Sequence, residues 1–401
     1  MAPSTRPSLP SQRAGRYVRQ PAGYSAFVPA PLPPRPPIDV ARISDLLSRA
    51  DIAIGRLDGV GRTLPDPDLF VAMYVRREAV YSSQIEGTQS TLDDVLAFEL
   101  EGHGQRIPLD VEEVVNHVAA MNYGLQRLGE LPLSLRLIRE IHEALMQDVR
   151  GADRSPGEFR RSQNWIGPAG GTLATAAFVP PPVHEMMEAL GDLEIFLHED
   201  ARYPPLIHAG LAHAQFETIH PFLDGNGRMG RLLITFLLVR RRVLQRPLLY
   251  LSLYLRRHRA EYYDRLMAVR FDGNWEGWLR FFLRGVAETA EEATGTAEAI
   301  LHLRDAHRET VRDLGTSALS MLDLLYERPI VNVAAAQRAL TVSWPTANKL
   351  IRSFQDRGLL EETTGQRRNR IFRYAPYLAL FSDAAFTAED DGPAIQTSEE
   401  A

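Results

Sequence analysis

The sequence predicts a mainly α-helical protein that ends in a small module of helices and short strands. Apolar residues recur at helical spacing through most of residues 40–293, whereas strand-like alternation is rare and no internal repeat is found. Between residues 316 and 375 the pattern changes to helix, tight turn and helix, followed by two β-rich pieces around a glycine-containing turn. The first pattern predicts a helical bundle, and the second predicts a winged helix-turn-helix module.

Length and composition are those of a globular protein. The 401 residues suggest two or three domains at about 150 residues each, and 45% of them are hydrophobic, enough for a large core. The chain has no cysteine, which excludes disulfides, cysteine–zinc sites and thiol chemistry. The N-terminus lacks the apolar segment of a signal peptide, and the apolar run 232–239 is too short for a bilayer that needs about 20 residues. We therefore expect a cytoplasmic location and no membrane contact.

The N-terminal part divides into an arm and a helical region. Residues 1–38 form a proline-rich arm in which PAPLPPRPP favours polyproline II; the arm is either a loose tail or a strap lying on the folded body. Residues 39–110 form a helical region with amphipathic helices expected at 40–57 and 69–86. Gly87 follows the second helix and is a typical C-terminal stop signal.

A core region is expected over residues 111–295, again built from helices. The helical patterns lie at about 110–128, 134–149, 183–198, 204–219, 228–243, 258–270 and 276–293. Residues 164–182, NWIGPAGGTLATAAFVPPP, break the pattern with paired glycines between two β-compatible pieces. This stretch predicts a short β-hairpin flap, with a plain surface loop as the alternative.

The C-terminal part is expected to contain a linker helix over residues 296–315 and the winged helix-turn-helix over 316–381. An acidic tail without lysine or arginine follows at 382–401 and is predicted to be disordered. Residues 316–375 carry nine Lys/Arg and five Asp/Glu, a net charge of +4 in a chain whose total is −6. The module is therefore a candidate for contact with DNA or with a protein partner.

One segment, HPFLDGNGRMGR at residues 220–231, concentrates groups that suit a polyphosphate. It leads from one apolar helix into the N-terminus of the next, where unpaired N–H groups favour an anion. Gly225 and Gly227 let the backbone approach a ligand closely and form an anion nest around Asn226. Arg228 and Arg231 are three residues apart on one helical face, and their planar guanidinium groups suit phosphate oxygens.

The same segment also offers a base, a metal ligand and an anchor. His220 can accept a proton near neutral pH. Asp224 precedes the nest and can hold Mg²⁺, which takes one or two carboxylates together with phosphate oxygens. Phe222 has no reactive group and is expected to pin the loop to the core. Each part alone would be a cap, a turn or a solvated face, but the combination predicts a polyphosphate site with a base beside it.

The segment resembles the signature of Fic-domain proteins, H-x-F-x-[D/E]-G-N-G-R-x-x-R, and fills every fixed position. The resemblance implies a Fic-type helical bundle that transfers AMP from ATP to a Ser, Thr or Tyr hydroxyl of a target protein. It assigns His220 as the base that deprotonates the hydroxyl, Asp224 as the Mg²⁺ ligand and Arg231 as the γ-phosphate contact. The ATP-binding residues that it implies are Gly225, Asn226, Gly227, Arg228, Met229, Gly230 and Arg231.

The resemblance extends to residues outside this segment. The 164–182 flap corresponds to the place where the family holds the target's modifiable segment by strand addition. Tyr262 and Tyr263, downstream of the motif helix, are either aromatic contacts for adenine or core residues. A homodimer is expected from the family alone.

A second short segment, SSQIEG at residues 82–87, resembles the inhibitory signature [S/T]-x-x-x-E-[G/N] of the same family. Ser82 and Glu86 are four residues apart and lie on one helical face. By resemblance, Glu86 pairs with Arg231 and denies it to the γ-phosphate of ATP. In some members the same glutamate aligns a water that removes AMP from modified targets, and the sequence favours neither role.

Two other functions compete with AMP transfer. Fic relatives that act as phosphorylating toxins typically lack the second glycine and the last arginine, so Gly227 and Arg231 argue against that activity. The other alternative is a DNA-binding regulator whose Fic body senses a nucleotide. It is supported by basic residues of the helix-turn-helix and the wing: Lys349, Arg352, Arg367, Arg368, Arg370 and Arg373.

Overall fold

The structure is a computed structural model of the whole chain. It describes residues 11–63, 67–101, 109–147, 154–167, 172–173, 175–199, 202–366 and 368–381. Several sequence-based predictions concern residues outside these ranges: the first ten residues of the proline-rich arm, the centre of the flap, Arg367 and the acidic tail 382–401.

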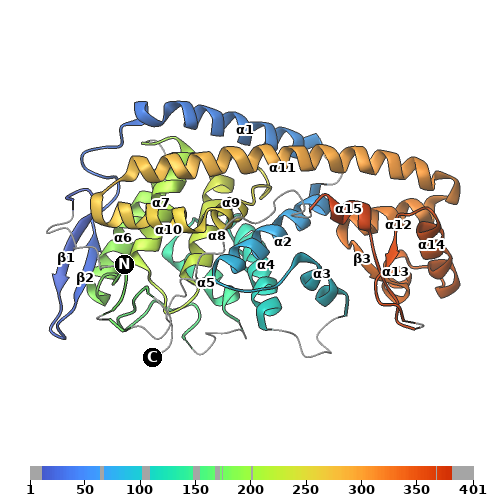
Figure 1. Cartoon of the computed structure of the whole chain (residues 1–401), viewed down its shortest axis with the longest axis horizontal. Coiled ribbons are helices and arrows are strands. Elements are labelled where there is room, and N and C mark those ends of the chain that lie inside the picture. The colour runs from blue at the N-terminus through green and yellow to red at the C-terminus, as the bar shows by residue number, and fades with distance from the viewer. Residues whose placement is uncertain are drawn as a thin grey trace.

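Helices make up most of the body, as the sequence predicts (Figure 1). They are α1 (Ser44–Thr63), α2 (Pro67–Ile85), α3 (Leu92–Glu101), α4 (Leu109–Arg127), α5 (Leu135–Leu145), α6 (Val183–His198), α7 (Pro205–Ile219), α8 (Asn226–Arg240), α9 (Ser252–Arg257), α10 (Arg259–Asp272) and α11 (Trp275–Val311). Short 3₁₀ turns precede α1 at Val40–Ile43 and follow α11 at Arg312–Leu314. Within the described ranges, none of the helices is both long and apolar enough to span a bilayer.

The described part of the N-terminal arm lies on the body. It folds into a hairpin of β1 (Gly15–Arg19) and β2 (Ser25–Pro29), which the sequence analysis did not predict. Phe27 is fully buried, with its ring 5.7 Å from that of Phe178. Arg13 forms an ion pair of 2.8 Å with Glu276 at the start of α11. These contacts decide between the two alternatives in favour of a strap.

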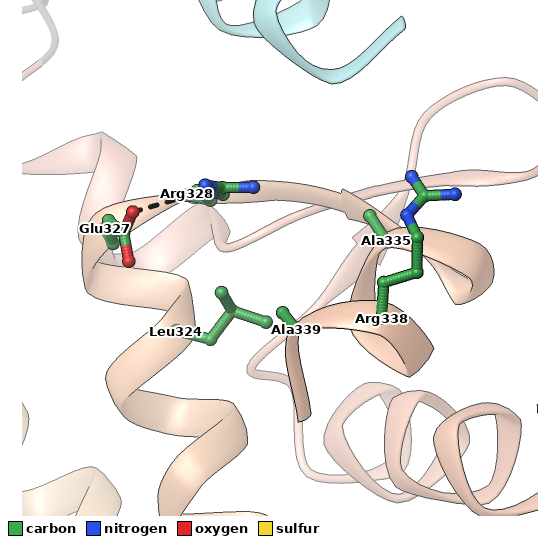
Figure 2. Close-up of a pocket in the computed structure, with 6 residues that line it drawn as sticks. All are labelled: Leu324, Glu327, Arg328, Ala335, Arg338 and Ala339. Atoms are coloured by element: carbon green, nitrogen blue, oxygen red, sulfur yellow. Dashed lines mark ion pairs between the residues drawn. The ribbon is translucent and has the colours of Figure 1, made fainter. Parts of the chain in front are cut away.

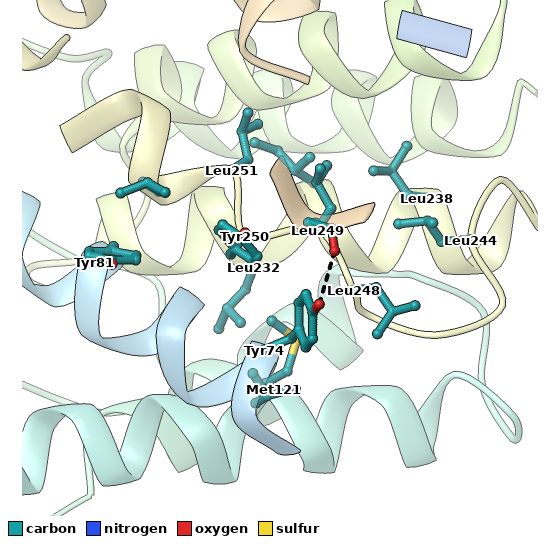
Figure 3. Close-up of a cluster of buried hydrophobic side chains, with 14 of the residues drawn as sticks. Tyr74, Tyr81, Met121, Leu232, Leu238, Leu244, Leu248, Leu249, Tyr250 and Leu251 are labelled. Carbon is teal, nitrogen blue, oxygen red and sulfur yellow. Dashed lines mark hydrogen bonds between the residues drawn. The ribbon is translucent and has the colours of Figure 1, made fainter. Parts of the chain in front are cut away.

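The central helices α7 and α8 place the motif in the core. All of α7 from Leu206 to Ile219 is buried, and α8 packs against it. Figure 3 shows the cluster that joins them to the N-terminal region, with Tyr74 from α2, Met121 from α4 and Leu232 from α8 turned toward one another. Burial of each such side chain contributes roughly 1.5–3 kcal/mol, so this cluster holds α2 against the core that contains α8.

The long helix α11 continues through the junction that the sequence predicts between a core helix and a linker helix at 296–315. A Cβ added at Gly295 would meet nothing within 4 Å, and the hydroxyl groups of Thr294 and Thr296 donate to carbonyls one turn earlier. Figure 1 shows α1 lying along α11. Packing along this length overrides the weak helix propensity of the Thr-Gly-Thr stretch.

The C-terminal module has the predicted helix, turn and helix followed by two strands, and it adds a short strand after its first helix that was not predicted. Its elements are α12 (Thr316–Glu327), β3 (Ile330–Asn332), α13 (Val333–Leu340), α14 (Trp344–Asp356), β4 (Glu361–Glu362), β5 (Ile371–Arg373) and α15 (Ala375–Ala379). The strands pair antiparallel in the order β3-β5-β4. Thr341, at φ 53°, makes the tight turn, and Ser343 caps α14. Assignment as a winged helix-turn-helix stays a prediction.

A pocket of about 360 Å³ opens on this module and contains no residue of the 220–231 motif. Figure 2 shows Leu324 from α12 facing Ala339 from α13, with Arg328 and Arg338 at the rim. Glu327 forms an ion pair of 3.4 Å with Arg328. This pocket is therefore separate from the site around the motif.

Candidate active site

The motif segment joins α7 to α8 through two residues with left-handed backbones. His220 ends α7 at φ 50°, and Gly225 precedes α8 at φ 72°. A Cβ at position 225 would lie 2.7 Å from Sδ of Met146. Glycine is therefore required there for its conformation and for its size.

The loop is fixed from inside by its own asparagine and phenylalanine. The Asn226 side chain accepts from the Phe222 N–H and donates to the Phe222 carbonyl, both at 2.9 Å. The buried Phe222 ring stacks on the imidazole of His142 at 3.6 Å. The predicted anchoring role of Phe222 is confirmed, and the amide of Asn226 shapes the loop that was expected to line the phosphate site.

His142 on α5 supports the loop in a single protonation state. Its Nδ1 accepts from the Gly157 N–H at 3.0 Å, so its Nε2–H donates to the Asp224 carbonyl at 3.0 Å. Burial lowers the pKa of His142 to about 4, which keeps the ring neutral at pH 7. The sequence analysis did not identify this residue, because nothing near it marks a contact more than 80 positions away.

The candidate base, His220, is buried and neutral. Its Nδ1 has no hydrogen-bond partner. Burial, followed by the charges of Arg270 and Arg160, lowers the pKa of His220 to about 3. The unprotonated imidazole, which a general base requires, is therefore the form present at pH 7.

Three polar side chains that the sequence analysis missed hold the end of α7. The His220 carbonyl accepts from Nε of Arg160 at 3.1 Å and from Nδ2 of Asn164 at 3.2 Å. Arg270 on α10 donates to the Glu217 carbonyl at 2.9 Å. Carbonyls at a helix C-terminus lack intrahelical partners, and these donors satisfy them.

The predicted flap has a β-type pairing at its base. Ile166 and Phe178 exchange two backbone hydrogen bonds of 2.8 and 3.0 Å across an antiparallel bridge. The guanidinium of Arg270 stacks over the Phe178 ring at 4.2 Å, which ties this base to the end of α7. Residues 168–171 and 174, in the centre of the flap, lie outside the described ranges.

Arg231 at the end of the motif is held by both residues of the predicted inhibitory segment. Its Nε donates to Oγ of Ser82 at 2.8 Å, and its Nη2 donates to Oε1 of Glu86 at 2.6 Å. Nη2 also donates to the Ser82 carbonyl at 2.9 Å. Burial disfavours the charge on Arg231, but Glu86, Tyr262, Glu217 and Tyr263 together outweigh burial and raise the pKa of Arg231. The contact expected between residues 82–86 and the last arginine is present.

Gly227 provides the space for this contact. A Cβ at position 227 would lie 2.2 Å from Oε1 of Glu86 and 3.0 Å from Nη1 of Arg231. A real Cβ cannot approach a carboxylate oxygen so closely. The glycine that was expected to let a phosphate approach therefore also lets the glutamate approach.

Arg228 and Asp224 face each other, a contact that the sequence did not predict. Nη2 of Arg228 lies 3.5 Å from Oδ1 of Asp224, and the Asp224 side chain is 13% exposed. Nη1 of Arg228 forms an ion pair of 3.2 Å with Glu113 on α4. Glu113 was not predicted, since a single acid on a helix resembles any solvated residue.

The remaining predicted nucleotide contacts lie deeper in the protein. Met229 is fully buried in the main core, and the Gly230 carbonyl accepts a hydrogen bond of 2.9 Å from Nδ1–H of His213. Tyr262 is fully buried, with its hydroxyl 2.9 Å from Nε2 of His213. Tyr263 is half-buried with its ring 5.1 Å from that of Tyr262. Tyr262 thus has the surroundings of a core aromatic, while Tyr263 is the more accessible of the two.

Buried titratable groups around the loop make stability depend on pH. Burial lowers the pKa of His142 to about 4 and those of His213 and His220 to about 3, so below pH 6.5 the unfolded chain binds more protons at these sites. Burial raises the pKa of Glu78 and Glu217 to about 7, which acts in the opposite direction between pH 4.5 and 7. Burial also lowers the pKa of His117 on α4 well below its usual range. The four histidines therefore outnumber the two acids by two.

We therefore expect the free energy of unfolding to rise with pH by about 2.7 kcal/mol per unit near pH 5 to 6, the value for two protons. Urea denaturation at the two pH values measures this slope. A His184→Gln variant, in which the changed side chain is 83% exposed, serves as the control and should keep the slope. A flat or falling profile in the wild type would contradict the prediction.

Comparisons with known proteins agree with this geometry. Residues 44–126 match the Fic/DOC family N-terminal domain, and residues 132–238 match the Fic/DOC family domain. The protein adenylyltransferase Fic of Aedes aegypti is 32% identical over 161 residues, which are 40% of this chain and 28% of that protein. The protein of the same name from Drosophila melanogaster is 27% identical over 263 residues, which are 64% of this chain and 48% of that protein. The chain thus spans less than half the length of these curated relatives.

A solved structure shares the fold over most of the chain. The crystal structure of a Fic family protein from Desulfovibrio desulfuricans G20 superposes with a TM-score of 0.53 at 22% sequence identity. The superposition covers 83% of this chain and 95% of that one. The two domain matches follow each other in sequence and enclose both the inhibitory segment and the motif. Residues 44–126 and 132–238 therefore resemble the two domains of the Fic/DOC family, in the order in which that family carries them.

Proposed function

We propose that this protein is an adenylyltransferase that transfers AMP from ATP to Ser, Thr or Tyr hydroxyls of target proteins and of itself, under inhibition by Glu86. The observation that carries the proposal is the complete motif loop with Arg231 bound by Ser82 and Glu86. The curated relatives named protein adenylyltransferase Fic support the reaction class.

In the proposed reaction, the hydroxyl oxygen of the target attacks the α-phosphorus of ATP. A new P–O bond forms, the bond to the β-phosphate breaks, and pyrophosphate leaves. His220 takes the hydroxyl proton, for which its neutral imidazole is suited. Transfer of this kind depends mostly on positioning and charge neutralisation, and the α8 N-terminus with Arg228 and Arg231 supplies both.

Mg²⁺ is proposed to enter with ATP as part of the substrate. Asp224 fits this role, because its partly exposed carboxylate lies at the mouth of the loop and magnesium commonly combines one such ligand with phosphate oxygens. Among the described residues, no group of three or more acidic or histidine side chains could hold a resident metal. When bound, the ion would neutralise phosphate charge beside the arginines.

Inhibition is proposed to result from competition for Arg231. The arginine is 2% exposed and its guanidinium already donates to Ser82 and Glu86, so few donors remain for a γ-phosphate. Glu86 also adds a negative charge where the phosphate would lie, and like charges in a buried site repel strongly. The targets are proposed to dock at the 164–182 flap by strand addition.

The test is the intact mass of the purified chain after incubation with Mg·ATP. Self-modification by a Glu86→Gly variant should add the mass of AMP, and a His220→Ala version of that variant is the blank. Addition of a phosphate mass would instead identify a kinase activity, and no addition would contradict the proposed transfer.

Removal of AMP is a separate activity with its own test. If the wild-type protein speeds the loss of AMP from labelled chain and the Glu86→Gly variant does not, the protein also removes AMP. A homodimer and a cytoplasmic location stay predictions; sedimentation of the purified chain tests the first.

A second function, contact with DNA through the C-terminal module, is favoured by the exposed face of α14. Lys349, Arg352 and Trp344 are exposed there, with Trp344 at 53%. Retention on duplex DNA should fall steeply with salt and should weaken in a Lys349→Glu/Arg352→Glu variant, since phosphate contacts release counterions. If neither salt nor the two substitutions weaken retention on DNA, a protein partner for this face would be favoured.

A further inference from the structure

Arg228 has an acidic partner that lies outside both signature segments. Oε2 of Glu113 on α4 is 3.2 Å from Nη1 of Arg228, and the two side chains are only 6% and 5% exposed. An arginine cannot lose its charge in a protein, so a buried one requires a fixed counter-charge. Glu113 provides it from a helix that packs against both α5 and α8.

The two terminal nitrogens of the Arg228 guanidinium face different parts of the site. Nη1 faces Glu113, whereas Nη2 faces Oδ1 of Asp224 and Sδ of Met146, each at 3.5 Å. Nε of Arg228 is buried without a hydrogen-bond partner. One end of the fork is therefore held from α4, while Nη2 points to the loop that carries the candidate magnesium ligand.

The two arginines of the motif thus have acidic partners of different kinds. Glu86, which pairs with Arg231, follows the last turn of α2, and its side chain is 23% exposed. Glu113 lies within α4 and is almost fully enclosed. Glu86 is therefore the more accessible of the two acids, and Glu113 is the more enclosed.

We propose that Glu113 is a positioning residue for ATP binding, which holds Arg228 so that its Nη2 meets the phosphates when Asp224 turns to the metal ion. This inference rests on the proposed function, since it concerns the same nucleotide site. Glu113 does not itself touch the nucleotide. It acts through Arg228, and it remains paired in the inhibited and the active state, unlike Glu86.

The neighbouring residue His117, one turn further along α4, is consistent with this arrangement. The ring is fully buried and neither nitrogen has a hydrogen-bond partner. Burial, together with the charges of Arg231 and Arg228, lowers the pKa of His117 well below its usual range. α4 therefore presents one acid and one neutral ring to the two arginines and adds no positive charge.

Calorimetric titration of Mg·ATP into the full-length Glu86→Gly protein tests the inference without relying on AMP transfer. Adding Glu113→Gln should weaken ATP binding about tenfold, because a charge-assisted contact that orients Arg228 is lost. The same change should have no further effect in an Arg228→Gln background, since Glu113 acts through that arginine. Glu112→Gln, a half-buried neighbour on α4, is the matched control and should leave ATP binding unchanged.

Unchanged binding in the Glu113→Gln variant, or an equal loss in the Arg228→Gln background, would overturn the proposal. Tighter binding would overturn it too, since Glu113 would then compete with the phosphates. Should Glu113→Gln fail to fold, Glu113→Asp keeps the charge with a shorter reach and should bind ATP more weakly than the Glu112→Gln control. A Glu86→Gly protein that binds ATP but transfers no AMP would refute the proposed function and leave this test intact.

Discussion

Replacement of Glu86 by glycine is expected to raise the rate of self-AMPylation by about tenfold to a hundredfold. The change removes the carboxylate that holds Nη2 of Arg231 at 2.6 Å and frees the guanidinium for the γ-phosphate. A hydrogen bond to a charged group contributes roughly 1.5–3 kcal/mol, and each 1.4 kcal/mol changes a rate by a factor of ten. Labelling with ATP that carries a radioactive α-phosphate measures the rate directly.

Two milder variants should rank between the wild type and Glu86→Gly in their rates of self-AMPylation. Glu86→Gln keeps the length of the side chain and removes its charge, so its rate should fall between those of the wild type and Glu86→Gly. Ser82→Ala removes only the acceptor for Nε of Arg231 at 2.8 Å and should produce the smallest increase. If Glu86→Gly labels itself no faster than the wild type, the idea that this pair restrains the enzyme fails.

Loss of His220 is expected to have the largest effect of any single change. In the Glu86→Gly background, His220→Ala should lower the transfer rate by about 10²–10⁴, the usual contribution of a positioned general base. ATP binding should change little, because the motif assigns phosphate contact to the α8 N-terminus and the arginines. Single-turnover labelling, paired with calorimetric titration of Mg·ATP, separates these two quantities.

The control for this variant is a histidine with no part in the site. His184→Ala, whose side chain is exposed, should leave both the rate and the ATP affinity unchanged. A His220→Ala protein that retains more than about a tenth of the rate would refute a general-base role. A large loss of ATP affinity would show instead that the change disturbs the loop, since the His220 carbonyl is held by Arg160 and Asn164.

The sequence predicts the motif loop well because its chemistry is local. His220, Asp224 and Arg231 lie within one short segment, and the two glycines reveal the backbone shape. The pairing of Glu86 with Arg231 was predicted from a second short segment, residues 82–87. Glu113, Arg160 and Arg270 were not predictable in this way, because each reaches the loop from a distant element and is unremarkable where it stands in the sequence.

The fold shows the same division between local and distant causes. The long amphipathic helices follow from periodicity, whereas the short helix α3 was missed although its start carries a recognisable cap. The Thr91 N–H donates to Oδ2 of Asp94 at 2.8 Å, and the Asp94 N–H donates to Oγ1 of Thr91 at 3.2 Å. The N-terminal hairpin and the unbroken helix α11 depend on surfaces far away in the chain, so local pattern could not predict them.

Gly227 has a consequence for how such an enzyme can be restrained. A methyl group at that position would lie 2.2 Å from a Glu86 oxygen. Under the proposed function it would also reduce the space for a phosphate of ATP. Under the proposed function, Glu86 and a phosphate of ATP would both need the space that the missing side chain at position 227 leaves. If Glu86 inhibits as we propose, inhibition depends on the absence of a Cβ at position 227 as well as on the Glu86 charge. A substitution that adds a Cβ there should then abolish both the inhibition and the proposed AMP transfer.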